Sequence, residues 1–154
     1  MIMKVGRIKK TLKKVSRKRG VVFFVDGKTA DVQKIMDKIT YIKEILEEIG
    51  GILSIKFFLE GSVSDTIITR ITESGCLPVI VPGDVDIYLA LEATEQIFNN
   101  KVTTVALATT NTDLLLVLIR TREEGKKTVL IKNGDKTTPL ENVVDLTLNL
   151  DVLE

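Results

Sequence analysis

From residue 21 onward, short continuous runs of apolar residues alternate with segments whose apolar residues recur at helical spacing. The first run, Val21–Val25, is β-branched and aromatic and stops at Asp26-Gly27, which is typical of a buried strand that ends in a turn. Strands that alternate with helices form parallel sheets with helices on both faces. We therefore predict a three-layer α/β fold around a mostly parallel, twisted sheet of five to six strands.

The same alternating pattern predicts the remaining strands and helices. Further strands are expected at Ile52–Leu59, Cys76–Val81, Val102–Ala108 and Thr128–Lys132, with a short edge strand at Val143–Leu150. Helices are expected at Val32–Ile49, Ser64–Thr72, Asp84–Asn99 and Asp113–Glu124. No linker separates these elements, so they form one predicted domain.

The first 25 residues differ in charge from the rest of the chain. They hold nine of the 22 lysines and arginines and none of the 21 acidic residues, so the remainder, with 13 basic residues, has a net charge of −8. Apolar residues among the first 20 are spaced by three, three, four and three, which predicts an amphipathic helix with a basic outer face. We expect a basic helical arm at residues 1–20 and an α/β domain at residues 21–154.

Cysteine and histidine usage restricts the chemistry that the chain can perform. The sequence contains one cysteine, Cys76, and no histidine. An intrachain disulfide, a thiolate zinc cluster and every Ser-His-Asp, Cys-His or histidine-ligated metal mechanism are therefore excluded. A bound metal would have to be a hard ion such as Mg²⁺ or Mn²⁺ on oxygen ligands. No apolar run approaches the ~20 residues of a membrane span, so we expect a cytoplasmic protein.

Carboxylate, hydroxyl and amide side chains follow the predicted ends of three strands. Because ligands of open α/β sheets bind beyond the carboxyl ends of the strands, these side chains should share one edge of the sheet. Close carboxylates repel one another, and a divalent cation would relieve that repulsion and could activate a water molecule. The residues are Asp26 after the first strand, Asp84 and Asp86 after the third, and Thr109, Asn111 and Asp113 after the fourth.

Purely structural roles suit the same residues. Asp84 and Asn111 stand at helix N-cap positions, and Asp86 and Asp113 in a first helical turn favour the helix dipole. Glu92 lies six residues beyond Asp86, about 120° short of two full helical turns, so the two acids do not share a helix face. We therefore expect Glu92 to be a solvated helix residue with a minor role.

Three short motifs form an ordered pattern. The first, Val25–Thr29, reads V-D-G-K-T, the second, Val85–Ala93, reads V-D-I-Y-L-A-L-E-A, and the third, Thr109–Leu114, reads T-T-N-T-D-L. In order and spacing they resemble the NYN domain, the PIN-like nuclease fold of the LabA-like group. The corresponding patterns of that family are V-D-G-x-N, V-D-V with a following apolar helix that carries a second acid, and S-G-D-S-D-F.

This resemblance implies a ribonuclease-type site, a candidate endoribonuclease that uses Mg²⁺ or Mn²⁺ against RNA phosphodiesters. Two departures weaken it, because Thr29 replaces the family asparagine and Asn111 replaces the first aspartate of the third motif. The alternative is a non-catalytic domain that binds RNA or a protein partner. A Rossmann-type small-molecule binder is disfavoured, since no glycine-rich phosphate motif follows a strand. The implied catalytic and metal-binding residues are Asp26, Asp86 and Asp113, with Asn111 as a further metal ligand and Asp84, Glu92 and Thr109 as secondary candidates.

A site for RNA requires positive charge nearby, because the acidic body repels phosphates. The basic arm could supply that charge, and we predict contacts to the RNA backbone rather than to bases, since aromatic residues for stacking are few. The arm could instead pack on the body or on a second copy in a homodimer, or lie on an anionic membrane surface. The predicted RNA-binding residues are Lys9, Lys10, Lys13, Lys14, Arg17, Lys18 and Arg19.

Overall fold

The computed structural model describes residues 20–152. The predicted arm helix and its RNA-binding lysines and arginines lie outside the described residues. Within the described part, no helix combines the length and apolarity that crossing a membrane requires.

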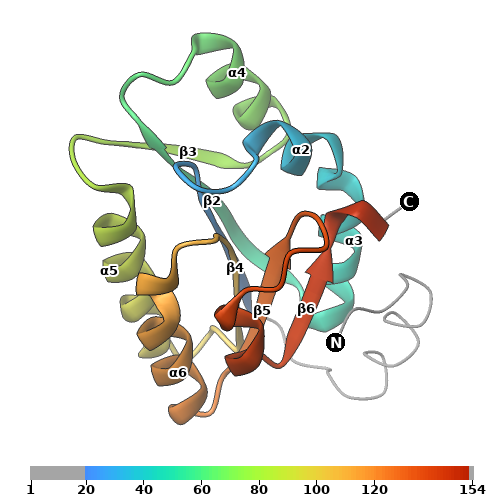
Figure 1. The fold of residues 1–154 in the computed structure, drawn as a ribbon, viewed down its shortest axis with the longest axis vertical. Helices are drawn as coiled ribbons and strands as arrows, with labels where there is room; N and C mark the ends of the chain where they lie inside the picture. The colour runs from blue at the N-terminus through green and yellow to red at the C-terminus, as the bar shows by residue number, and fades with distance from the viewer. Residues whose placement is uncertain (1–19, 153–154) are drawn as a thin grey trace.

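A single parallel sheet of six strands runs through the described part of the chain (Figure 1). Its spatial order is β3-β2-β1-β4-β5-β6, and every neighbouring pair is parallel. The predicted α/β architecture is confirmed, including the position of the last strand at an edge. The strands are β1 (Val21–Asp26), β2 (Ile52–Glu60), β3 (Leu77–Val81), β4 (Thr104–Ala108), β5 (Lys127–Lys132) and β6 (Leu146–Asn149).

Helices cover both faces of this sheet (Figure 1). One face packs against α2 (Val32–Asp37), α3 (Ile39–Ile49) and α4 (Asp65–Glu73). The other packs against α5 (Val85–Ile97) and α6 (Leu115–Glu123). Three short 3-10 turns complete the described chain, and they are η1 (Thr112–Leu114), η2 (Pro139–Val143) and η3 (Leu150–Val152).

The central strand β1 is buried along its whole length because it lies between β2 and β4 and both of its faces are covered. Its side chains alternate between two apolar cores, with Phe23 on the α3 side and Phe24 on the α5 side. Phe24 meets Phe58 of β2 edge to face, with ring centroids 5.6 Å apart. The apolar runs seen in the sequence are therefore the two-sided core of the sheet.

The predicted helix at Val32–Ile49 is wrong in one respect, because the structure divides it into α2 and α3 at Lys38. Apolar residues on both helices pack against the same core, which is why a single periodic pattern runs through the break. The β-branched residues Ile39 and Thr40, which are weak helix formers, follow Lys38 directly. The predicted helix at Asp113–Glu124 likewise begins with the 3-10 turn η1 before α6.

Candidate functional site

The parallel strands β1 and β4 bring the first and third sequence motifs together. Val25 and Ala108 are paired in the sheet register, so Asp26 and Thr109 leave adjacent strands side by side. The loop after β1 and the loop after β4 meet at this carboxyl edge of the sheet. This is the edge at which the sequence predicts the candidate residues to lie.

Asp26 is fully buried and accepts three hydrogen bonds from neutral groups of the chain. The backbone N–H of Lys28 donates to Oδ1 at 3.1 Å. The hydroxyls of Thr29 and Thr109 both donate to Oδ2, at 2.7 and 2.8 Å. Since a buried carboxylate is costly without such partners, these donors stabilise the charge of Asp26 within the protein.

The two threonine hydroxyls also tie the two loops together. While donating to Asp26, Thr29 Oγ1 accepts a hydrogen bond from the backbone N–H of Thr110 at 3.0 Å. Thr109 Oγ1 accepts one from the backbone N–H of Asn111, also at 3.0 Å. The two hydroxyl oxygens are 3.2 Å apart. We call Asp26, Thr29 and Thr109 the threonine–aspartate network.

Asn111 extends this network toward the second motif. Its Nδ2 donates to Oδ2 of Asp86 at 3.3 Å, and its Oδ1 accepts the backbone N–H of Asp113 at 2.9 Å, which caps η1. Both the nitrogen and the oxygen of the Asn111 side-chain amide therefore have hydrogen-bond partners. Asp86 is half-buried, whereas Asp113 is exposed. The expected N-cap role of Asn111 is confirmed.

Two secondary candidates have other surroundings. Asp84 is exposed and occupies the N-cap position of α5, but its side chain makes no capping hydrogen bond. Glu92 is half-buried and forms an ion pair with Lys56 of β2. The expectation of a solvated Glu92 was therefore wrong. The reason is that α5 lies across β2, which brings a lysine of the sheet against that side of the helix.

A divalent cation fits this arrangement poorly. A carboxylate offers about four lone-pair positions, and three at Asp26 are already used by donors of the chain. The carbonyl oxygen of Asn111 is committed to η1. Among residues 20–152, no three Asp, Glu, Cys or His side chains gather in a way that could hold a metal. The metal site expected at Asp26, Asp86, Asp113 and Asn111 stays a prediction.

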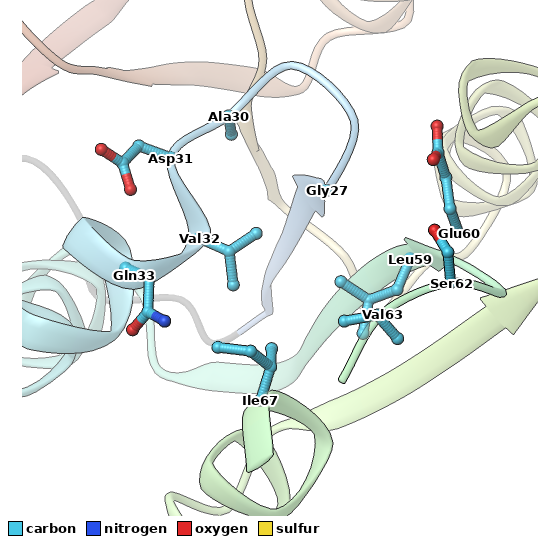
Figure 2. A pocket seen from close by; sticks show the side chains of 10 residues that line it. All are labelled: Gly27, Ala30, Asp31, Val32, Gln33, Leu59, Glu60, Ser62, Val63 and Ile67. Atoms are coloured by element: carbon cyan, nitrogen blue, oxygen red, sulfur yellow. The ribbon is translucent and has the colours of Figure 1, made fainter. Parts of the chain in front are cut away.

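An apolar cavity of about 360 Å³ lies on the other side of the loop after β1 (Figure 2). Val32, Val63 and Ile67 point into its centre, while Asp31 and Glu60 stand at its rim. No single stretch of sequence predicts this cavity, because its walls come from two separate helices and a strand end. The loop of residues 27–31 thus borders both the threonine–aspartate network and the cavity.

A second buried charge lies beyond the end of β5. Lys132 and Glu141 form an ion pair at 3.1 Å, and Glu141 also accepts the backbone N–H of Thr138 at 2.8 Å. Burial raises the pKa of Glu141, but the hydrogen bond from Thr138 and the charge of Lys132 together outweigh it, so the pKa falls below its ordinary value of 4.5. The pair fixes η2 beside the carboxyl edge.

Two threonines of the site have a larger role than the sequence predicted. Thr29 was treated as a lost family asparagine, yet it donates the shortest hydrogen bond to Asp26. Thr109 was a secondary candidate, yet it is buried and central. The available signal was the presence of a threonine after each of two adjacent strands, at positions that face one carboxylate.

The chain is similar to known proteins in sequence and in fold. Residues 20–151 match a family model described as the NYN domain. Over 145 residues the chain is 29% identical to an uncharacterized protein of Methanocaldococcus jannaschii, in a match that covers 92% of this chain and 60% of that protein. The fold is similar to the crystal structure of a protein of unknown function from Vibrio parahaemolyticus, with a TM-score of 0.69 and 17% identity over 87% of this chain and 94% of that chain.

Proposed function

Because the chain belongs to the NYN domain family, whose fold is of the nuclease type, we propose that it binds RNA through phosphodiester contacts and cleaves RNA inefficiently. We also assign it to the LabA-like group on its three motifs. The observation that carries the proposal is the hydrogen bonding of Asp26, whose carboxylate is satisfied by Thr29, Thr109 and the Lys28 backbone.

The threonine–aspartate network favours a weakened site for a physical reason. Hard cations bind where several carboxylate oxygens are free and negative charge accumulates. Here two hydroxyl protons are directed at Oδ2 of Asp26, and the amide Asn111 brings no charge to its position between Asp86 and Asp113. The chain's own donors therefore occupy oxygen lone pairs of Asp26 that a cation would need.

The basic arm supports RNA as the ligand class. Outside the first 25 residues the net charge is −8, which repels a phosphate backbone, so the nine basic residues of that segment are the natural source of affinity. We propose that the basic residues from Lys9 to Arg19 make these phosphate contacts. Affinity should then fall with salt, with a slope of roughly −0.7 per phosphate contact on single strands.

Binding of a labelled single-stranded RNA by the full chain tests this part of the proposal. We expect replacement of Lys13 and Lys14 by glutamine to weaken binding several-fold and to reduce the salt slope by about one to two. The matched control replaces Lys101 and Lys136, two exposed lysines of the α/β domain, and should leave affinity nearly unchanged. Equal effects of the two pairs would contradict the role of the arm.

A metal-dependent endoribonuclease is the second candidate function. It is supported by the positions of Asp26, Asp86 and Asp113 after strands that end at one sheet edge, and by Asn111, which donates to the Asp86 carboxylate and accepts the backbone N–H of Asp113. Incubation of the same RNA with Mn²⁺ separates the candidates. Rapid Mn²⁺-dependent cleavage by the unmodified chain that disappears in Asp26→Asn would support the efficient nuclease and overturn the weakened site, whereas slow cleavage would agree with it.

A further inference from the structure

The solvent-facing side of α5 carries an apolar stripe. Ile87 and Leu91 of α5 are 54% and 62% exposed, and Phe98, the C-cap residue directly after the helix, is 67% exposed. At about 100° per residue their side chains fall within about 40° of one another on the helix circumference. The opposite side of α5 enters the core through Val85, Leu89, Ala93 and Ile97.

The neighbouring helix α6 continues this surface. α6 packs beside α5 on the same face of the sheet, and both helices begin at the carboxyl edge (Figure 1). Leu116, the second residue of α6, is 73% exposed. Ile87, Leu91, Phe98 and Leu116 are called the α5–α6 face. A monomeric protein rarely leaves so many large apolar side chains exposed in one area.

The dimensions of the α5–α6 face match those of a protein interface. A helix of 13 residues, such as α5, is about 20 Å long, and a packed neighbour adds about 8–10 Å to its width. The accessible area of such a two-helix face approaches the ~800 Å² per partner that stable interfaces bury. The face is therefore large enough to hold two chains together.

The charges around the face suit a second copy of this chain. From Asp84 to Phe98, both included, there are four acidic residues and no lysine or arginine. Glu95 is exposed on the outer side of α5, and Arg120 is exposed on α6. The present partner of Arg120 is Glu124, the C-cap residue of α6, and this exposed ion pair contributes little stability.

We propose that the α5–α6 face forms a twofold homodimer. A twofold axis turns the second copy so that its α6 meets α5 of the first copy and the reverse contact forms simultaneously. Phe98 lies at the far end of α5 from Ile87 and Leu116, so the twofold axis must be inclined to the two parallel helices, which then cross those of the other copy and bring each Phe98 toward the apolar end of that copy. Glu95 of each copy then lies near Arg120 of the other.

Sedimentation equilibrium of the full chain tests the dimer. The unmodified chain should have twice the chain mass, and Leu91→Glu should reduce it to the chain mass. The matched control Leu53→Glu, at a 48% exposed leucine of β2, should leave the dimer intact. Far-ultraviolet circular dichroism must show that both variants are folded. A monomeric unmodified chain, or a dimer that resists Leu91→Glu, would overturn the proposal.

A charge exchange tests the pairing of α5 with α6. Glu95→Arg alone and Arg120→Glu alone should each weaken the dimer several-fold, because each places like charges across the interface. The double variant should recover most of the lost affinity. Losses that simply add in the double variant would contradict the contact between Glu95 and Arg120 and with it this arrangement of the copies.

Discussion

At the scale of single residues, the candidate site is governed by what each polar atom of Asp26 already binds. The carboxylate is inaccessible to water, and its donors are two hydroxyls and one backbone N–H. The same hydroxyls accept backbone N–H groups of the loop after β4. Removal of one hydroxyl therefore affects both a buried charge and the geometry of a loop.

Thr109→Val should destabilise the fold by about 1–3 kcal/mol, because it removes a donor to a buried carboxylate and an acceptor for the Asn111 N–H at nearly constant volume. Urea unfolding measures this change. The control Thr137→Val lies on an exposed residue and should change the free energy of unfolding by less than about 0.5 kcal/mol. Equal effects at the two positions would contradict the assigned hydrogen bonds.

Glu141 should make stability depend on pH. Its folded pKa lies below its unfolded value of 4.5, so its contribution is complete above pH 4.5 and is lost as the pH falls through the folded pKa. Glu141→Gln should therefore be less stable than the unmodified chain at neutral pH, and the difference should shrink in acid. Urea unfolding across this range, with Glu60→Gln at an exposed carboxylate as control, measures the effect. A constant difference at all pH values would refute this account.

At the scale of elements, the turn after β1 is set by a close approach of two strands. A Cβ at Gly27 would lie 2.4 Å from the carbonyl oxygen of Phe58, and the N–H of Gly27 donates to that oxygen at 2.8 Å. Glycine is therefore required here for contact between β1 and β2 rather than for turn formation alone. This contact fixes the start of the loop that carries Thr29 to Asp26.

Gly27→Ala should destabilise the protein by about 1–3 kcal/mol, since the methyl group must displace backbone. Thermal unfolding followed by circular dichroism measures the loss. Gly61→Ala is the matched control, because a Cβ there meets no atom within 4 Å. We expect the control to be neutral or slightly stabilising. A neutral Gly27→Ala would mean that β1 and β2 are further apart than described.

Prediction from the sequence succeeded for elements and failed for hydrogen bonds. The six strands and their parallel arrangement follow from apolar runs, because both faces of such a sheet are buried. The break at Lys38 left no trace in the apolar spacing, because α2 and α3 share one core. The edge that holds Asp26 was predictable from topology, whereas the direction of the Thr29 hydroxyl depends on loop conformation.

At the scale of the whole molecule, charge is unevenly distributed along the chain. The acidic α/β domain carries the threonine–aspartate network at its carboxyl edge. The helices α5 and α6 cover one side of the sheet, and the α5–α6 face is exposed on their outer side. The first 25 positions hold nine of the 22 basic residues and no acidic residue. In the proposed function, the arm supplies affinity for RNA while the network lowers the capacity of the edge to recruit a cation.

Calorimetric titration with Mn²⁺ tests the central claim, that the chain's own donors replace a cation at the carboxyl edge. The unmodified chain should release no more heat than Asp26→Asn. Asn111→Asp should bind Mn²⁺, because it restores a carboxylate between Asp86 and Asp113. The control Asn133→Asp adds the same charge at an exposed residue after β5 and should not bind. Binding by the unmodified chain that Asp26→Asn abolishes would contradict the account.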